Sequence, residues 1–283
     1  MSAQIMDGTA VAAGILDHVA HRASELRDQG VRPTLATVLV GDDRSSAIYV
    51  AMKRRTCARV GIESRHVPLP TATTTAELIA VIEELSEDPT VHGILLQHPV
   101  PAHIDGRAAF EAIAPDKDVD GVTLASFAAM AFARPGFPSC TPAGIMRLLD
   151  AYGVDPAGKN AVVVGCGPIL GKPMGMMLLA REATVTYCHA RTADLAGAIG
   201  AADIVIAACG VPNLIKAADL RPGVIVVDAG YHAGGIGDVD PTGLAERASL
   251  VTPVPGGVGP MTIAMLMEQT VAAAERQPAP VLV

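Results

Sequence analysis

The fold is decided by Ala161-Val-Val-Val-Gly-Cys-Gly-Pro-Ile-Leu-Gly171. The apolar residues predict a buried strand, and the glycines that follow predict a tight turn into a helix that continues through Met174 and Leu178. Glycine lets the backbone approach a pyrophosphate closely, and a helix N-terminus supplies free amides with a partial positive charge. The spacing G-x-G-x-x-x-G differs from the common dinucleotide fingerprint by an added residue. We expect a dinucleotide site here, and the alternative is a purely structural turn.

Further runs of this kind flank that stretch on both sides. Strands are predicted at residues 35–40, 91–97, 183–187, 204–207 and 224–228, and helices at about 9–29, 45–60, 75–86, 142–149 and 261–275. Ser45 or Ser46 is expected to cap the second helix, and Pro142 is expected at the first position of the fourth. Strand and helix alternation with glycine at the strand ends predicts an α/β fold with parallel sheets.

Length and composition suggest two domains with aliphatic cores. The chain has 283 residues, 50% of them hydrophobic but only 3% aromatic, which suits parallel sheets of Val, Ile and Leu. A Pro/Gly break at residues 135–138 marks the expected boundary. We therefore predict an N-terminal parallel-sheet catalytic domain at 1–138 and a Rossmann-like domain at 139–260, with a cleft between them. The C-terminal helix, within 261–283, is expected to pack back on the first domain, and the tail at 278–283 to be disordered.

Charge and cysteine usage exclude several classes of protein. The net charge is −8 without a long Lys/Arg run, so nucleic acid is not an expected partner. The N-terminus lacks a signal-peptide pattern and no window approaches about 18 uninterrupted apolar residues, so we expect no membrane span and a cytoplasmic location. Five cysteines without a C-x-x-C pair argue against disulfides and structural zinc, and no metal is expected. They are interpreted as small buried hydrophobes, with Cys166 as the exception.

The end of the strand at 183–187 bears on the choice of cofactor. An acidic residue that would bind the NAD ribose is absent there, and Arg191 offers a base that could accept the 2′-phosphate of NADP. The alternative for Arg191 is a solvated surface side chain. The turn Cys209-Gly-Val-Pro212 and the segment Asp228-Ala-Gly230 are further places where a ligand could lie against bare backbone.

A second group of candidate residues lies in the N-terminal half. Tyr49 and Lys53 share a helix face, and Gln97 ends an apolar strand, where side chains of an open parallel sheet point into a cleft. Asp118 and Asp120 lie in a loop. Taken singly, each also fits a structural role, namely a half-exposed Tyr beside a solvated Lys, a polar strand end, and loop carboxylates that cap local amides.

Longer motifs give these residues a context. They are Tyr49-Val-Ala-Met-Lys53 with Gly61-Ile62, Gly93-Ile-Leu-Leu-Gln-His-Pro-Val-Pro101, Pro115-Asp-Lys-Asp-Val-Asp-Gly121, Cys140-Thr-Pro142 and Pro253-Val-Pro-Gly-Gly-Val-Gly-Pro-Met-Thr262. In order and spacing, over nearly the whole chain, they resemble the bifunctional methylenetetrahydrofolate dehydrogenase/methenyltetrahydrofolate cyclohydrolase family.

The resemblance implies a homodimeric enzyme of one-carbon metabolism with tetrahydrofolate substrates and a nicotinamide cofactor. It implies oxidation of 5,10-methylenetetrahydrofolate to the 5,10-methenyl form, and hydrolysis of that form to 10-formyltetrahydrofolate. The expected catalytic residues are Lys53, Gln97 and Asp120, and the expected substrate-binding residues are Tyr49, Gln97, Asp120, Pro255, Gly256 and Gly257. The expected cofactor-binding residues are Gly165, Cys166, Gly167, Gly171, Ala190, Arg191, Gly210 and His232.

The sequence departs from the family pattern in the dinucleotide half. Gly165-Cys-Gly167 stands where the family usually has Gly-Arg-Ser, His189-Ala-Arg191 where it has His-Ser-Arg or a similar run, and His232 where it often has Asn. The lost groups lie near the 2′-phosphate in the family, so a weak preference for NADP, carried by Arg191, is expected. The alternatives are a cyclohydrolase-only or non-catalytic folate-binding paralogue, and a shikimate-dehydrogenase-like reductase.

Overall fold

The computed structural model describes residues 2–277, apart from the side chains of residues 44–48. The chain divides into two compact units. Within the described part, unit 1 comprises residues 2–13, 130–134 and 139–262, and unit 2 comprises residues 14–129, 135–138 and 263–277. Two helices, α1 (Gly8–Asp28) and α10 (Val258–Arg276), begin in unit 1 and end in unit 2.

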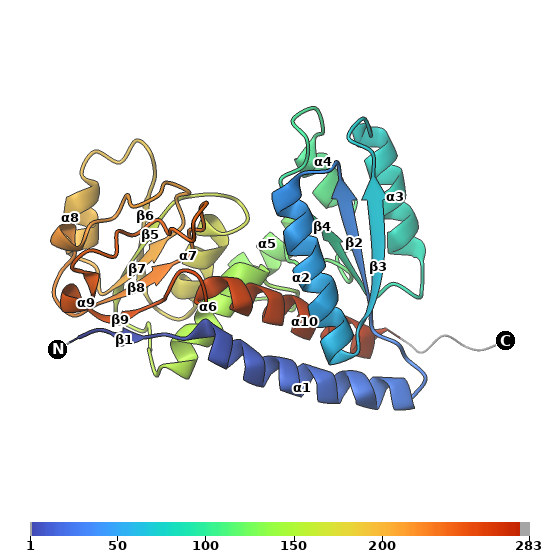
Figure 1. Cartoon of the computed structure of the whole chain (residues 1–283), viewed down its shortest axis with the longest axis horizontal. Coiled ribbons are helices and arrows are strands. Elements are labelled where there is room, and N and C mark those ends of the chain that lie inside the picture. The colour runs from blue at the N-terminus through green and yellow to red at the C-terminus, as the bar shows by residue number, and fades with distance from the viewer. Residues whose placement is uncertain (1, 278–283) are drawn as a thin grey trace. The chain divides into compact units, whose positions relative to one another are not determined.

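Unit 1 is built on a six-stranded sheet in which every neighbouring pair is parallel, in the order β1-β9-β8-β7-β5-β6 (Figure 1). The strands are β1 (Gln4–Ile5), β5 (Asn160–Val164), β6 (Thr184–Cys188), β7 (Ile204–Ala207), β8 (Val224–Asp228) and β9 (Ala248–Val251). Apart from the exposed Asn160 at the start of β5, the central strands β5 and β7 consist of Val, Ile and Ala and are buried, because helices cover both faces of a parallel sheet.

The helices of unit 1 follow the strands in sequence. They are α6 (Cys140–Ala151), α7 (Gly171–Ala180), α8 (Leu195–Gly200), a 3₁₀ turn at Ala217–Asp219 and α9 (Leu244–Arg247). The chain leaves β5 for β6 on one side, and returns to β7 on the other side of β5. This reversal of strand order is a switch point, and ligands of open parallel sheets bind outside the carboxyl ends of the strands at such a point.

Unit 2 contains a smaller parallel sheet with the order β3-β2-β4. The strands are β2 (Thr34–Val40), β3 (Glu63–Leu69) and β4 (Gly93–Leu96), and the helices between and after them are α2 (Arg44–Val60), α3 (Thr75–Glu87), α4 (Gly106–Glu111) and α5 (Leu124–Ala131). The central strand β2 is buried along its length. Figure 1 shows α2 and α3 on opposite sides of the strands, so both faces of this sheet are covered.

The predicted fold class, α/β with parallel sheets in two domains, is confirmed. Three strands, β1, β3 and β9, lie where no strand was predicted. The reason is clearest for β3, which reads Glu-Ser-Arg-His-Val-Pro-Leu and contains Pro68. Because β3 is an edge strand, one row of its backbone groups needs no partner, so polar residues and a proline are tolerated there.

Two details of the predicted helices need correction or lie out of reach. Helix α6 begins at Cys140 after the N-cap residue Ser139, so Pro142 is inside the first turn and not at its first position. Its position directly after the expected domain boundary predicts a helix that bridges the domains, but α6 belongs wholly to unit 1. Helix α2 begins at Arg44, so Ser45 and Ser46 are inside the helix and neither is its N-cap residue, in contrast to the prediction. The predicted disordered tail at 278–283 lies outside the described residues. Within the described residues, no helix has the length and apolar character that crossing a membrane requires.

The loop that carries Asp118 is held by that buried carboxylate. Asp118 is fully buried and accepts hydrogen bonds from Val122 N at 3.1 Å, Thr123 N at 2.9 Å and the Ser126 hydroxyl at 2.6 Å. The alternative reading of Asp118, a loop carboxylate that caps local amides, is therefore what the structure shows. The same hydrogen bonds fix the backbone on both sides of Asp120.

We predict that Asp118→Ala lowers the free energy of unfolding by about 3 kcal/mol or more, because three donors lose their acceptor inside the protein. The matched control is Asp116→Ala, which removes the same charge from an exposed position of the same loop and should change stability by about 0.5 kcal/mol or less. Urea unfolding of both variants measures the difference. Equal stabilities would show that the Asp118 hydrogen bonds do not hold the loop.

Candidate active site and dinucleotide site

In unit 2, the structure brings Lys53 and Gln97 together. Lys53 is on α2, and Gln97 directly follows β4, where its backbone N–H still donates to Val38 O of the central strand at 2.8 Å. The Lys53 amine donates to Gln97 Oε1 at 3.0 Å, and Gln97 Nε2 donates to the carbonyl of His98 at 2.8 Å. Gln97 is buried, and the His98 carbonyl holds its Nε2 atom. Its Oε1 atom is therefore a fixed acceptor for the Lys53 amine.

Asp120 lies close to the same group through His98. The His98 Nε2 and Asp120 Oδ2 atoms are 4.0 Å apart. Burial lowers the pKa of His98, the Asp120 charge opposes that shift, and the Lys53 charge adds to it. The lowered pKa favours the neutral imidazole, and its ring stands edge-on to Phe110 with 6.1 Å between the ring centroids. Lys53, Gln97, His98 and Asp120 thus form one polar cluster at the carboxyl end of β4.

His98 was not among the predicted site residues. The sequence signal for it was the abrupt end of the strand at His98-Pro99, which places the imidazole directly after Gln97. Tyr49 lies one helical turn before Lys53 and is 37% exposed, so its ring is open to a ligand. Chemically, the cluster offers an amine, an imidazole and a carboxylate for proton movement. No group of three or more His, Cys, Asp or Glu side chains in the described residues could hold a metal ion.

The predicted substrate-binding residues Pro255, Gly256 and Gly257 lie in unit 1, before α10. Their loop packs on the start of α1: Thr9 N donates to Gly256 O at 3.0 Å. A Cβ on Gly8 would stand 1.8 Å from Gly257 O, so the two segments touch backbone to backbone. Gly256 has φ +104°, a value that favours glycine. The structure therefore shows a tightly packed loop whose glycines cannot be exchanged.

The glycine-rich turn joins β5 to α7 in the predicted way. Gly165 has φ +112°, and a Cβ there would lie 2.0 Å from Ala208 O, at the end of the neighbouring strand β7. A Cβ on Gly171 would lie 1.9 Å from Gly165 O. At Gly167, by contrast, a Cβ would meet no heavy atom within 4 Å. The outer glycines are thus required by packing, and the middle of the turn leaves its backbone open.

The side chain of Cys166 contacts the end of the neighbouring strand β6, where its Sγ donates a weak hydrogen bond to Cys188 O at 3.4 Å. Cys166 is half-buried, in agreement with its prediction as the exception among the cysteines. Cys209 is half-buried as well, and the other cysteines are buried. After β6 the chain turns at residues 189–192, and both Ala190 and Arg191 are exposed. Among the described residues of this turn Arg191 is the one cation, and no carboxylate takes the place of the acid that binds an NAD ribose.

Asp238 connects the turn after β7 with the loop after β8. It is fully buried and accepts hydrogen bonds through Oδ2 from Cys209 N at 2.7 Å and Gly210 N at 2.8 Å. Its Oδ1 atom lies 2.8 Å from His232 Nε2. The predicted cofactor residues Gly210 and His232 are therefore brought together by a carboxylate that was not predicted. The sequence signal that could have found Asp238 is its place between Gly237 and Val239, because glycine and valine are residue types that are often buried.

Burial next to Asp238 also changes the titration of Cys209. Desolvation raises the pKa of the Cys209 thiol to about 11, the Val211 backbone hydrogen bond works against this rise, and the charge of Asp238 adds to it. At pH 8 the thiol is protonated, so Cys209 is a weak nucleophile and behaves as part of the turn.

Together, a Rossmann-like sheet with a glycine-rich turn at its switch point, and a second parallel-sheet unit with a buried amine cluster, define a two-domain α/β enzyme of the dinucleotide-dependent class. The sequence matches two family models, "Tetrahydrofolate dehydrogenase/cyclohydrolase, catalytic domain" over residues 6–120 and "Tetrahydrofolate dehydrogenase/cyclohydrolase, NAD(P)-binding domain" over residues 139–278. The chain belongs to the tetrahydrofolate dehydrogenase/cyclohydrolase family, as the sequence resemblance predicted.

Relatives of known name agree with this placement. A protein named "Bifunctional protein FolD 1" from Streptomyces avermitilis is 63% identical over 98% of this chain and 96% of its own length. The FolD crystal structure from Campylobacter jejuni superposes with a TM-score of 0.96 at 42% identity, over 98% of this chain and 100% of that one. The Trypanosoma brucei enzyme, complexed with NADP cofactor and inhibitor, gives a TM-score of 0.93 at 34% identity, with 98% of each chain covered.

The predicted enzyme class and the predicted nicotinamide cofactor are confirmed by this membership. The shikimate-dehydrogenase-like alternative is not supported. Shikimate 5-dehydrogenase from Listeria monocytogenes shares 15% identity at a TM-score of 0.50, over 87% of this chain and 91% of that one, which is a likeness of fold alone.

We predict that Asp238→Ala raises the KM for the dinucleotide about tenfold or more, because the turn at Cys209–Gly210 and the His232 imidazole lose their shared acceptor. The control, Asp240→Ala, removes an equal charge that pairs at the surface with Lys216 and should leave KM within about twofold. Steady-state kinetics with varied dinucleotide gives both values. A KM that Asp238→Ala does not move would separate this carboxylate from cofactor binding.

Proposed function

We propose that this chain oxidises 5,10-methylenetetrahydrofolate with NAD(P) and hydrolyses the 5,10-methenyl product to 10-formyltetrahydrofolate. The observation that carries the proposal is the hydrogen bond from Lys53 to Gln97, because it holds an amine next to a carboxyl group and an imidazole in one cluster. The hydrolysis needs proton movement at a folate nitrogen and at water, and such a cluster can supply it.

The dinucleotide fits the turn between β5 and α7. Leu170, the N-cap residue of α7, provides no side-chain hydrogen bond to the first amides of the helix, and Gly167 leaves the backbone open. These amides and the positive end of the helix dipole suit a pyrophosphate. When bound, the nicotinamide supplies the hydride acceptor. The chain's own part in this step is to hold both reactants in register, which needs no separate acid.

Hydrolysis is the step in which Lys53 acts directly. Water attacks the cationic methenyl carbon, and the Lys53 amine, after giving its own proton to solvent, takes up the proton that the water loses. The resulting ammonium returns a proton to N5, the bond between that nitrogen and the carbon breaks, and the carbon remains on N10 as a formyl group when its hydroxyl proton leaves. Gln97 keeps the amine in place through both transfers, so its role is to position and not to react.

The remaining predicted residues bind folate. Asp120 accepts hydrogen bonds from the amino edge of the pterin, and Tyr49 stacks on the ring system. Pro255, Gly256 and Gly257 contribute backbone surface to the same substrate. Residues 1–138, with the C-terminal helix, form the folate-binding domain, and residues 139–260 form the dinucleotide domain. The homodimer, which the family resemblance implies, and the cytoplasmic location stay predictions.

We predict that Lys53→Met leaves the folate Kd within a few-fold but lowers the cyclohydrolase rate by about a hundredfold or more, since positioned proton transfer is worth about 10² to 10⁴. Lys53→Arg is the matched variant, because it keeps the charge but cannot give up its proton at neutral pH, and it should be equally slow. Decay of methenyltetrahydrofolate absorbance measures the rate. If either variant retains more than about a tenth of the wild-type rate, Lys53 does not carry the proton.

We predict a weak preference for NADP over NAD that depends on Arg191. Cys166 stands where the family usually has an arginine, so one charge-assisted bond to the 2′-phosphate is missing, at a cost of about ten- to hundredfold in preference. Arg191→Ala should remove the remaining preference, whereas Arg181→Ala, at the other end of α7 and paired with Asp150, should not. The preference is measured as the ratio of kcat/KM for NADP to kcat/KM for NAD in the wild type and in both variants. A strong NAD preference in the wild type, or a ratio unchanged in Arg191→Ala, would leave Arg191 as a surface charge only.

A further inference from the structure

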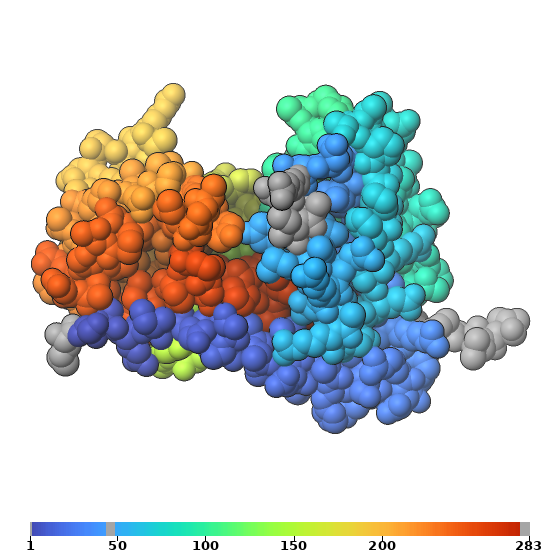
Figure 2. All heavy atoms as spheres, in the orientation of Figure 1, coloured from blue at the N-terminus to red at the C-terminus, as the bar shows by residue number. Residues whose placement is uncertain are grey.

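Unit 2 contains a pocket between α2 and β3 that the proposed reactions do not use. It has a volume of about 410 Å³ and is lined by Ala51, Arg54, Arg55, Ala58, Ile62 and Ser64. We call it the α2–β3 pocket. The α2 residues that line it follow one face of the helix at the spacing i, i+3, i+4 and i+7, and β3 forms the other wall. In Figure 2, α2 and the strand that follows it are on the face turned to the viewer.

The pocket is separate from the Lys53 cluster. The cluster is at the carboxyl end of β4, at one edge of the sheet, whereas Ser64 is on β3 at the other edge. Arg54 follows Lys53 directly in sequence, but successive residues of a helix point about 100° apart. One helix thus presents Lys53 to one site and Arg54 to another.

One residue that lines this pocket, Ser64, has a buried hydroxyl without a hydrogen-bond partner among the described residues, and two further atoms of this kind are on the same sheet. In the described residues, five buried side-chain N or O atoms have no hydrogen-bond partner, and three of them, Thr37 Oγ1, Ser64 Oγ and His66 Nδ1, are on β2 and β3. Thr37 is in register with His66, and Ser64 is two residues before His66, so all three side chains are on the same face of the sheet. A buried polar group without a partner is costly, so the unpartnered Ser64 hydroxyl at the pocket wall indicates that a polar ligand or water completes the site.

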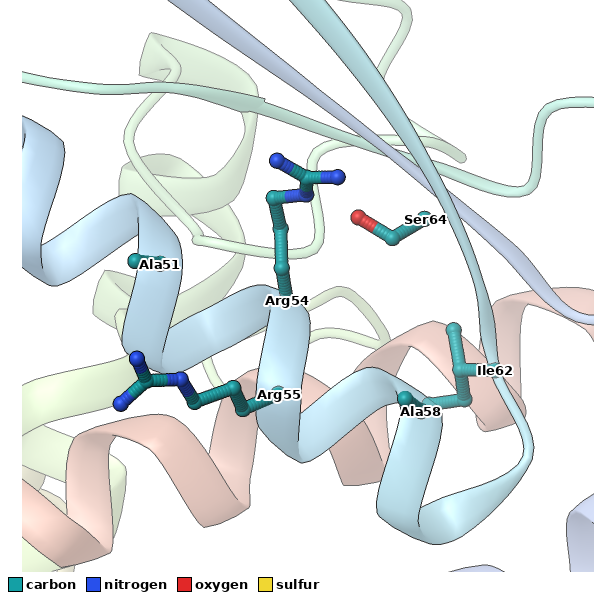
Figure 3. A pocket seen from close by; sticks show the side chains of 6 residues that line it. All are labelled: Ala51, Arg54, Arg55, Ala58, Ile62 and Ser64. Atoms are coloured by element: carbon teal, nitrogen blue, oxygen red, sulfur yellow. The ribbon is translucent and has the colours of Figure 1, made fainter.

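The two arginines that line the pocket are not neutralised by a carboxylate of the described residues. Neither Arg54 nor Arg55 forms an ion pair or hydrogen bond through its guanidinium group with any described residue, in contrast to Arg59, which pairs with Asp17. Figure 3 shows the Arg54 side chain and the Ser64 hydroxyl on two sides of the same space, and Arg55 leaves the helix in another direction. Arg54 and Ser64 are therefore the groups placed to contact a ligand, and Arg55 adds to the local positive potential.

We propose that the α2–β3 pocket binds a small organic phosphate, with Arg54 and Ser64 as the residues that hold the phosphate group. A phosphate has enough acceptor oxygens to take hydrogen bonds from a guanidinium and a hydroxyl at the same time. The walls that Ala51, Ala58 and Ile62 provide are apolar, and the volume falls within the range of pockets for small organic ligands, about 300–1,000 Å³. The ligand therefore carries an apolar body next to its phosphate.

The test is a calorimetric titration of the full chain with three probes, phenyl phosphate, inorganic phosphate and benzoate. NADP is present at saturation, so that the dinucleotide site is filled. We expect phenyl phosphate to bind most tightly, because it combines the anion with an apolar ring. Arg54→Gln should weaken its binding about ten- to hundredfold, and Ser64→Ala about two- to tenfold. Arg55→Gln should have a smaller effect than Arg54→Gln.

Arg59→Gln is the matched control, because it removes an equal charge from the same helix outside the pocket, and it should leave phenyl phosphate binding unchanged. Dehydrogenase activity without added phosphate should be that of the wild type in Arg54→Gln, which also shows that the variant folds. The proposal is overturned if phenyl phosphate does not saturate the wild type, or if Arg54→Gln and Arg59→Gln weaken it equally. Benzoate binding as tightly as phenyl phosphate, with the same dependence on Arg54, would assign the pocket to carboxylates instead.

Discussion

The parallel direction of the strands is the constraint on which both sites depend. In a parallel sheet the carboxyl ends of all strands lie on the same side of the sheet. The residues that follow the strands therefore come together there, whatever their distance in sequence. Gln97 follows β4, Gly165 follows β5, Gly210 lies after β7 and His232 after β8. Lys53 is the exception, because it does not follow a strand. It reaches the carboxyl end of β4 from helix α2, and Gln97 fixes its position there.

Close backbone contact is what keeps these strand ends in place. Gly165 approaches Ala208 O so closely that no side chain fits between β5 and β7. The same principle operates around Asp228, where a Cβ on Gly237 would lie 1.9 Å from the carboxylate. Asp228 accepts hydrogen bonds from Gly230 N, Asp238 N and Val239 N, and these oppose the rise in its pKa that burial causes. The loop after β8 is thus folded around the Asp228 carboxylate. Asp238, which this loop carries, then accepts hydrogen bonds from the turn after β7.

Buried carboxylates organise the loops of both units in the same way. Asp118 in unit 2 and Asp238 in unit 1 are each fully buried, and each accepts backbone N–H groups that no strand or helix satisfies. Such a carboxylate replaces regular structure where a loop must hold a fixed shape beside a ligand. The candidate residues themselves, Asp120 and Gly210, are neighbours of these anchors in sequence or through a hydrogen bond. The loops are therefore shaped by residues other than those proposed to bind substrate or cofactor.

The sequence by itself determined the parallel α/β class, the glycine-rich turn and the positions of Lys53, Gln97 and Asp120, because apolar periodicity, glycine spacing and long motifs are local features of the chain. It did not reveal the edge strand β3, whose polar residues and Pro68 lack the apolar pattern that marks a strand. Nor did it reveal His98 beside Asp120, Asp238 hydrogen-bonded to Gly210, or His66 opposite Thr37 in the sheet. These are pairings between distant segments. Only the tertiary structure decided them, because register and burial depend on which strands lie side by side.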